Sequence, residues 1–197
     1  MALTNRCVSA SIRHMEDNGL RPAAALVDAA RAGDGAAIER LLRTAWAHAF
    51  RISLMILKDR SLAEDAAQEA SISAGLQIHR LRDGAAFSKW FFRITVRQAI
   101  RLLPKTPETL PLSEVAPVPV SAPSEILELR TSILGLPLAL RAPLVLATYC
   151  GLTGEEIGAL LNISTGAVRF RVWRAKQILR DQLFPKDEAK QKASVAI

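Results

Sequence analysis

The sequence contains few of the residues from which catalytic and metal sites are usually built. Among 197 residues it has only two cysteines, Cys7 and Cys150, and three histidines, His14, His48 and His79. None of them stands at the spacing of a metal-binding motif, and no glycine-rich phosphate loop occurs. We therefore expect neither a metal ion nor a cofactor.

Long apolar runs are missing as well. No stretch of about 18 uncharged apolar residues occurs, so we expect no membrane insertion. Residues 1–22 carry charged side chains without an apolar block, which argues against a signal peptide. Together with the two widely separated cysteines, these features predict a disulfide-free cytoplasmic protein.

Prolines divide the chain. Six of the ten prolines fall within residues 104–123, where a helix cannot persist. Aromatic content is only 5% while alanine and leucine are abundant, which favours helices over sheets. We predict an all-α protein with two small helical domains, at 24–103 and 125–184, joined by a Pro-rich linker at 104–124. An N-terminal extension (1–23) and a polar tail (185–197) flank them.

The second domain contains a predicted helix-turn-helix at residues 151–176. Thr153 and Glu156 form a capping box for its first helix, Asn162 suits the turn, and Ser164 or Thr165 can cap the second helix. At helical spacing, one face of the second helix is apolar, with Val168, Val172, Ala175, Leu179 and Leu183. The opposite face or its flank carries Arg169, Phe170, Arg171, Trp173 and Arg174.

Charge points to the partner of this second helix. Residues 164–186 contain six Lys or Arg and one Asp, and the whole chain has a net charge of +7. Such a surface fits nucleic acid, and the helix-turn-helix predicts duplex DNA. The alternative is an amphipathic helix whose basic face is solvated and whose aromatic residues pack on a neighbouring domain.

The first domain has an apolar helical pattern interrupted by a turn at residues 33–35. A second capping box, Ser61 with Glu64, predicts the start of the next helix. On that helix Asp65, Gln68 and Glu69 share one face, and we call these three residues the acidic patch. It either docks a basic protein surface or is an ordinary solvated face.

A third helix, predicted at 87–103, combines a core stripe with basic residues. Its core stripe contains Phe87, Trp90, Phe91 and Ile94. Lys89, Arg93 and Arg97 follow at i, i+4 and i+8, and no acidic residue lies between 87 and 105 to relieve their repulsion. A basic row beside aromatic residues favours a polyanion, and single-stranded nucleic acid in particular.

Four segments in order carry a family resemblance. LVDAARAGDGAAIERLL, AEDAAQEA, GAAFSKWFFRI and GLTGEEIGALLNISTGAVRFRVWRAK resemble bacterial RNA polymerase sigma factors of the extracytoplasmic-function (ECF) group. The resemblance implies a sigma-two domain at 24–103 and a sigma-four domain at 125–184. Because the polymerase catalyses RNA synthesis, it also implies that this chain is a specificity subunit and not an enzyme.

The resemblance assigns roles to the residues already singled out. It implies that Asp65, Gln68 and Glu69 dock on the beta-prime clamp of core RNA polymerase, and that the sigma-four domain meets the beta flap. The loop 81–86 and the helix with Lys89, Arg93, Arg97 and Arg101 would capture and melt the minus-ten element of promoter DNA. Residues at the start and exposed face of the last helix would enter the minus-thirty-five element: Ser164, Thr165, Arg169, Phe170, Arg171, Trp173 and Arg174. The family's usual further partner is an anti-sigma factor.

Two other functions remain open at this stage. One is a helix-turn-helix regulator that does not dock on polymerase, which leaves the acidic patch and the second basic helix unexplained. The other is a sigma mimic that sequesters an anti-sigma factor, which has no need of groove-facing arginines.

Overall fold

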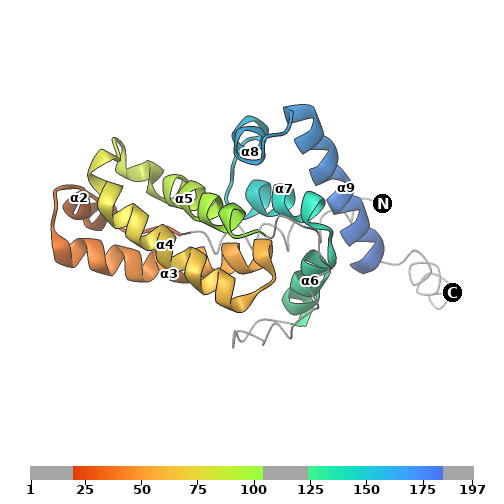
Figure 1. Cartoon of the computed structure of the whole chain (residues 1–197), viewed down its shortest axis with the longest axis horizontal. Coiled ribbons are helices and arrows are strands. Elements are labelled where there is room, and N and C mark those ends of the chain that lie inside the picture. Colours follow the sequence, from red (N-terminus) through yellow and green to blue (C-terminus); the bar gives the residue numbers. More distant parts are fainter. Residues whose placement is uncertain (1–19, 104–123, 184–197) are drawn as a thin grey trace, which may run out of the picture.

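The computed structural model describes residues 20–103 and 124–183, and within these ranges every regular element is helical (Figure 1). The all-α prediction with two helical groups is therefore confirmed. The predicted Pro-rich linker lies outside the described residues except for Ser124. No helix in the described ranges is long and apolar enough to cross a membrane.

The N-terminal group contains four α-helices and two short 3-10 segments. The α-helices are α2 (Ala24–Arg31), α3 (Gly35–Leu57), α4 (Arg60–Gln77) and α5 (Phe87–Arg101). The 3-10 segments η1 (Ile78–Arg80) and η2 (Gly84–Ala86) lie in the connection from α4 to α5. Helices α3, α4 and α5 pack on one another, and α2 covers α3 at the end where the α4–α5 connection lies (Figure 1).

Small residues let α4 approach α3 closely. Its inward face is made of fully buried alanines: Ala63, Ala66, Ala67, Ala70 and Ala74. A Cβ atom added at Gly75 would stand 3.2 Å from a methyl group of Leu42 on α3, so a larger residue would require the Leu42 side chain to shift. The outward face of α4 carries polar and charged side chains together with the exposed Ile72 and Leu76.

The predicted capping box at the start of α4 is wrong. Helix α4 begins at Arg60, and the Asp59 carboxylate caps it by accepting a hydrogen bond from the Leu62 N–H at 2.9 Å. Glu64 instead forms an ion pair with Arg60 at 2.9 Å, one turn away. Since an aspartate two residues upstream is an equally good cap, the serine is left inside the first turn.

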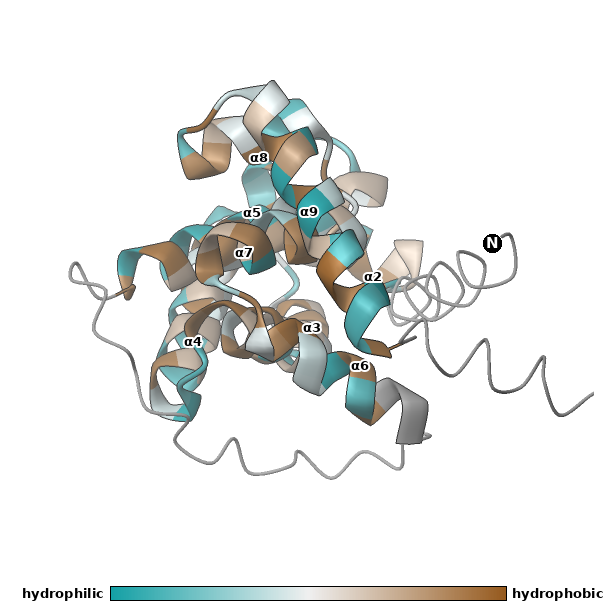
Figure 2. Ribbon diagram, turned by 90° about the vertical axis from the view of Figure 1, so that its right-hand side faces the viewer, coloured by the Kyte–Doolittle hydropathy of each residue, from teal (hydrophilic) through white to brown (hydrophobic). Residues whose placement is uncertain are grey.

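The C-terminal group contains α6 (Ser124–Gly135), α7 (Leu138–Thr148), α8 (Gly154–Leu161) and α9 (Thr165–Leu183). Helix α7 is at its centre and packs on α9, α8 and, across the molecule, on α3 of the N-terminal group. Most of α7 has the colour of hydrophobic residues in Figure 2, and Leu144, Val145 and Leu146 of this helix are buried. The two groups are thus in direct contact.

Arg141 of α7 forms the most buried polar link between the groups. Its side chain is 4% exposed, and its guanidinium donates to the carbonyls of Met55 at 2.6 Å and Ile56 at 3.0 Å, in the last turn of α3. It also donates to the carbonyl of Leu136 at 2.7 Å, beyond the end of α6. Carbonyls at a helix C-terminus lack intrahelical partners and carry partial negative charge, so one cation stabilises both helix ends.

Burial lowers the pKa of Arg141 to about 10, and the guanidinium therefore stays charged at neutral pH. Elsewhere on the interface, the Tyr149 hydroxyl lies 3.2 Å from Nδ1 of His48 on α3. The Tyr149 ring also lies 6.2 Å from that of Phe92 on α5, measured between centroids. Polar and aromatic contacts thus extend the interface from α3 to α5.

Replacing Arg141 should destabilise the fold. In Arg141→Met several buried carbonyls lose their donor, and we expect the free energy of unfolding to fall by about 2 to 4 kcal/mol. Arg141→Lys, which keeps the charge with fewer well-placed donors, should lose less. Urea denaturation followed by circular dichroism measures both. The control is Arg40→Met on the exposed side of α3, expected to stay within about 0.5 kcal/mol of the parent; equal losses at both positions would contradict the role of Arg141.

Candidate nucleic-acid interface

The helix-turn-helix formed by α8 and α9 has the predicted caps. The Thr153 hydroxyl accepts from the Glu156 N–H at 3.3 Å, and Glu156 Oε2 accepts from the Thr153 N–H at 2.8 Å. Asn162 ends α8 in the left-handed region, with φ 53°. The sequence analysis missed Gly158: a Cβ there would stand 2.7 Å from the Ile163 carbonyl oxygen, so the turn needs a glycine.

The apolar face and the basic, aromatic face of α9 lie on opposite sides of the helix, as predicted. Ser164 rather than Thr165 supplies the cap, since its hydroxyl accepts from the Ala167 N–H at 3.2 Å. The apolar face is directed into the core, with Val168, Ala175 and Leu179 buried and Val172 and Leu183 half-buried. The outward face exposes Arg169, Phe170, Trp173 and Arg174, and Arg171 is half-buried on the flank.

Two aromatic rings stand on the outward face of α9 without a protein cover. Phe170 is 62% exposed and Trp173 is 54% exposed. Their ring centroids are 6.1 Å apart, and arginines flank them on the same helix. Exposed apolar surface of this kind marks an interaction site. The alternative in which these rings pack on a neighbouring domain is wrong for the described residues.

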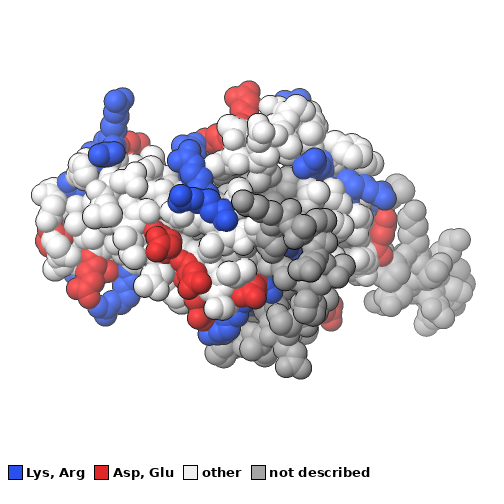
Figure 3. Space-filling model, viewed as in Figure 1, with Lys and Arg blue, Asp and Glu red and all other residues white. Residues whose placement is uncertain are grey.

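Helix α5 presents the second predicted nucleic-acid surface, which we call the basic stripe: Lys89, Arg93, Arg97 and Arg101. Lys89, Arg97 and Arg101 are exposed, and Arg93 is half-buried. The core stripe behind them is buried as predicted, except that Trp90 is half-buried and reaches the surface. Figure 3 shows basic side chains gathered over α5.

A cavity of about 340 Å³ lies where the basic stripe meets the α4–α5 connection. Basic side chains from both elements line it, together with the indole of Trp90: Arg80, Arg82, Lys89 and Arg93. Cations beside an aromatic face suit a phosphate and the base attached to it. The family resemblance implied that this loop and the α5 helix act together, and the structure places basic side chains of both around one cavity.

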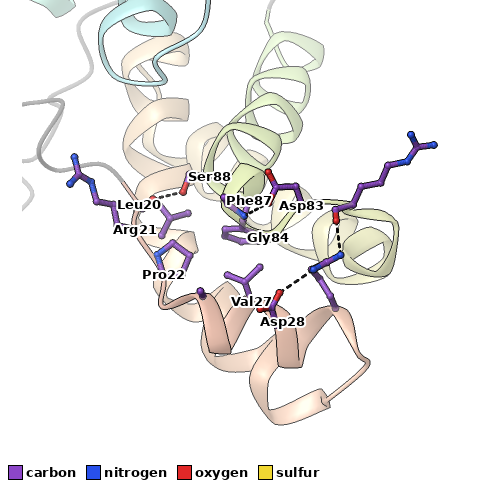
Figure 4. A pocket seen from close by; sticks show the side chains of 13 residues that line it. Leu20, Arg21, Pro22, Val27, Asp28, Asp83, Gly84, Phe87 and Ser88 are labelled. Carbon is purple, nitrogen blue, oxygen red and sulfur yellow. Dashed lines mark hydrogen bonds and ion pairs between the residues drawn. The ribbon is translucent and has the colours of Figure 1, made fainter.

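Arg31 of α2 holds the loop that borders this cavity. Its Nε donates to the Leu81 carbonyl and its Nη2 to the Arg82 carbonyl, each at 2.7 Å, while its Nη1 pairs with Asp28 at 3.0 Å. A Cβ at Gly84 would meet Asp28 at 3.1 Å, so the loop also packs closely on α2. Figure 4 shows this region, where a second cavity of about 620 Å³ separates the start of α2 from the loop.

The acidic patch of α4 is exposed as a group. Asp65, Gln68 and Glu69 all face outward, and acidic side chains gather over α4 in Figure 3. The same face continues into Ile72, 49% exposed, and Leu76, 71% exposed, which the sequence analysis missed. Both residues follow Gln68 at helical spacing, i+4 and i+8, and this spacing indicates that they share its exposed face.

One contact joins the basic stripe of α5 to the helix-turn-helix. Arg93 of the basic stripe forms an ion pair with Oε1 of Glu156, at the start of α8. The Glu156 carboxylate, whose other oxygen caps α8, has its pKa lowered first by the Thr153 N–H bond and then by Arg93. Sequence reasoning gave this residue only its capping role, because Arg93 lies 63 positions away.

No group of three or more His, Cys, Asp or Glu within residues 20–103 and 124–183 is arranged to hold a metal ion. His48 packs between Phe92 and Tyr149, and burial, followed by the charge of Arg51, lowers its pKa. Cys150 is buried, which raises the pKa of its thiol far above the ordinary value. These side chains serve packing.

Two family models match the chain. Residues 37–106 match sigma-70 region 2, and residues 126–179 match sigma-70 region 4. The ECF RNA polymerase sigma-E factor of Escherichia coli K12 is 30% identical, over 61% of this chain and 73% of its own length. The ECF sigma factor SigE of Mycolicibacterium smegmatis is 32% identical over 77% of this chain, which spans 64% of that relative.

Solved structures share the fold. CnrH in complex with the cytosolic domain of CnrY aligns with a TM-score of 0.54 and 19% identity, over 83% of this chain and 97% of that one. The sigma factor RpoE of Bartonella quintana, in complex with the anti-sigma factor NepR, aligns with a TM-score of 0.53 and 18% identity. This alignment covers 76% of this chain and 97% of that one. At these identities the likeness concerns the fold alone.

Removing the Arg31 side chain should loosen the loop at the 340 Å³ cavity. Arg31→Ala deletes two hydrogen bonds to loop carbonyls, and we expect amide hydrogen exchange at residues 81–86 to rise about 5- to 30-fold, with the α9 amides unchanged. Hydrogen exchange read by mass spectrometry measures this. Arg43→Ala, an exposed arginine paired with Glu39 on α3, is the matched control; unchanged loop exchange in Arg31→Ala would show that Arg31 does not hold the loop.

Proposed function

The chain belongs to the ECF group of RNA polymerase sigma factors in the sigma-70 family, and we propose how its surfaces divide the work of directing core polymerase to promoters. The proposal depends on one observation. In region 2 the basic side chains of α5 and its loop stand beside the half-buried Trp90, and in region 4 the arginines of α9 stand beside the exposed Phe170 and Trp173. Two such faces on one chain correspond to two promoter elements.

We assign the acidic patch to polymerase docking. Asp65, Gln68 and Glu69 stand out from a helix whose other face is sealed by alanines against α3, so the patch is rigidly presented. Exposed Ile72 and Leu76 extend it along α4 with apolar area, so that polar and apolar contacts are offered side by side, as in protein interfaces. The partner is core RNA polymerase through its beta-prime clamp, and the beta flap is assigned to region 4.

The minus-ten element is assigned to the α5 side of region 2. The 340 Å³ cavity offers the Trp90 ring and four cations to an unstacked base and its phosphates. Lys89, Arg93, Arg97 and Arg101 continue along α5 as a track for the backbone of the separated strand. Arg31 holds the loop that closes this cavity.

The minus-thirty-five element is assigned to α9. Its cap residue Ser164, its first residue Thr165 and its exposed side chains lie at the start and outer face of the second helix of a helix-turn-helix, the part that enters the major groove. Arg169, Arg171 and Arg174 supply donors for base edges and phosphates, and Phe170 and Trp173 supply apolar contacts for thymine methyl groups. The chain itself acts without catalysis, in the cytoplasm.

An anti-sigma factor is a further proposed partner. The solved structure of RpoE holds an anti-sigma factor, as its title states. The exposed surfaces of α4 and α9 in this chain leave room for such a protein, which would regulate access to polymerase.

Removing the acidic patch should weaken polymerase binding. In Asp65→Ala with Glu69→Ala we expect affinity for core RNA polymerase to fall by about 1 to 3 kcal/mol, because charge-assisted contacts are lost. Fluorescence anisotropy of labelled protein with core polymerase measures it. The matched control removes the same charge elsewhere, with Glu39→Ala and Glu128→Ala, both exposed; equal affinities for the two double variants would overturn the docking role.

Arg174→Ala should distinguish base contact from phosphate contact at α9. If the guanidinium reads a base, promoter binding by the holoenzyme falls by about 1 to 3 kcal/mol and specificity relaxes at one position. If it binds phosphate, all sequences weaken alike and the salt slope decreases by about 1. Gln182→Ala, exposed near the end of the same helix, is the control. Groove insertion would be refuted by an Arg174→Ala variant that transcribes and binds like the parent.

A further inference from the structure

The two aromatic rings of α9 form a small apolar surface that is fixed in place. Phe170 and Trp173 are 62% and 54% exposed, and their ring centroids lie 6.1 Å apart with the ring planes tilted by 36°. At three residues apart they share one face of the helix. On the opposite face Val168 and Ala175 are buried, so turning the helix to cover the rings would expose the core. The rings are therefore held ready for a partner.

Cations stand on both sides of this ring pair. Arg169 precedes it and Arg174 follows it, and both side chains are exposed. A guanidinium binds a phosphate or the polar edge of guanine. The Phe170 ring forms no conventional hydrogen bond, and most of the Trp173 indole is equally apolar. A partner that fits this face therefore supplies apolar groups between polar ones.

The major groove of DNA contains one such apolar group. It is the methyl group on C5 of thymine, whereas the other base-edge groups that distinguish the base pairs there are hydrogen-bond donors or acceptors. Successive base pairs are stacked about 3.4 Å apart, so the 6.1 Å between the ring centroids is less than two steps. Both rings can thus contact methyl groups within three consecutive base pairs.

Cytosine methylated at C5 presents the same methyl group at the same place. Its pairing partner is still guanine, whose O6 and N7 suit the guanidinium of Arg169 or Arg174. Unmodified cytosine has only a hydrogen atom at C5. A ring that contacts the methyl group alone therefore treats thymine and 5-methylcytosine alike, and distinguishes both from unmodified cytosine.

The size of the effect follows from the apolar area that a methyl group removes from water. Burying one methyl group against an aromatic ring raises affinity about fourfold, and burying two raises it about 15-fold. A bidentate contact from arginine to guanine discriminates between bases by about 5- to 150-fold. The arginines therefore select the site, and the methyl groups adjust how strongly the selected site is occupied.

From this geometry we propose that Phe170 and Trp173 read the C5-methyl groups of pyrimidines, so that binding of α9 to duplex DNA responds to cytosine methylation. The proposal rests on the proposed function only in the assignment of α9 to duplex DNA. Its chemical target is the methyl group, whether thymine or 5-methylcytosine carries it. A promoter element with cytosine at a contacted position is bound more tightly once that cytosine is methylated.

The experiment starts from a duplex that the holoenzyme itself selects. The full chain assembled with core polymerase enriches sequences from a random duplex library, and fluorescence anisotropy measures its affinity for the enriched duplex. Replacing one thymine at a time by uracil removes one methyl group and nothing else. Wherever this replacement weakens binding, the base pair is exchanged for cytosine with guanine, and the cytosine is either unmodified or methylated at C5.

The double variant Phe170→Ala with Trp173→Ala removes both rings, and because both are exposed we expect it to fold, as circular dichroism checks. Leu127→Ala, at an exposed apolar residue of α6, is the matched control. In the parent and the control each contacted methyl group, on thymine or on cytosine, should raise affinity about fourfold. In the double variant the same methyl groups should leave the affinity unchanged. If this variant binds too weakly to measure, Phe170→Ala alone is read in the same way.

The proposal is overturned if no methyl group affects the parent more than the ring-deleted variant. It is also overturned if uracil weakens binding while cytosine and 5-methylcytosine are bound alike, because base identity and not the methyl group is then read. Run-off transcription from the enriched duplex tests the proposed function separately. A transcribed duplex without a methyl effect defeats only the methyl readout, whereas a methyl effect on a duplex that supports no transcription defeats only the promoter role. If no sequence is enriched, both are overturned.

Discussion

The hydrogen bonding of one buried guanidinium fixes how the two halves of this molecule meet. Arg141 lies where α3 ends and where the chain leaves α6, and its donors satisfy carbonyls that no helix can satisfy internally. A buried carbonyl without a hydrogen-bond donor costs free energy. Helix α7 must therefore stay close enough to the end of α3 for the Arg141 side chain to reach these carbonyls. Helix α8 packs on α7 and is joined to α5 by the Arg93–Glu156 ion pair.

In α4, α5 and α9, helical periodicity puts the packing residues on one face and the proposed contact surface on the other. Helix α4 turns alanines inward and the acidic patch outward, while α5 buries phenylalanines beneath its basic stripe. On α9 the apolar stripe is seated in the core and the aromatic rings face outward. Each recognition surface is therefore built on a rigid helix, whose inward face fixes its orientation.

Features that depend only on residues one or two helical turns away could be predicted from the sequence. The faces of α5 and α9, the Thr153 capping box and the left-handed Asn162 all follow from local spacing, and all are present. The contacts of Arg141, Arg31 and Glu156 join residues 50 to 86 positions apart and depend on tertiary packing, which periodicity does not contain. At the start of α4, two acceptable caps stood two residues apart, and propensity alone could not choose between them.

The uncovered face of α9 has a consequence for timing. Phe170 and Trp173 are open to solvent in the same arrangement in which α8 overlies α5. On the assignment of α9 to duplex DNA proposed above, this surface is accessible without any rearrangement of the helices, whereas Arg93 of the basic stripe is already paired with Glu156. Under that proposal a duplex would meet α9 before its strands separate, and a sequence that fails this first contact would be released with its base pairs intact.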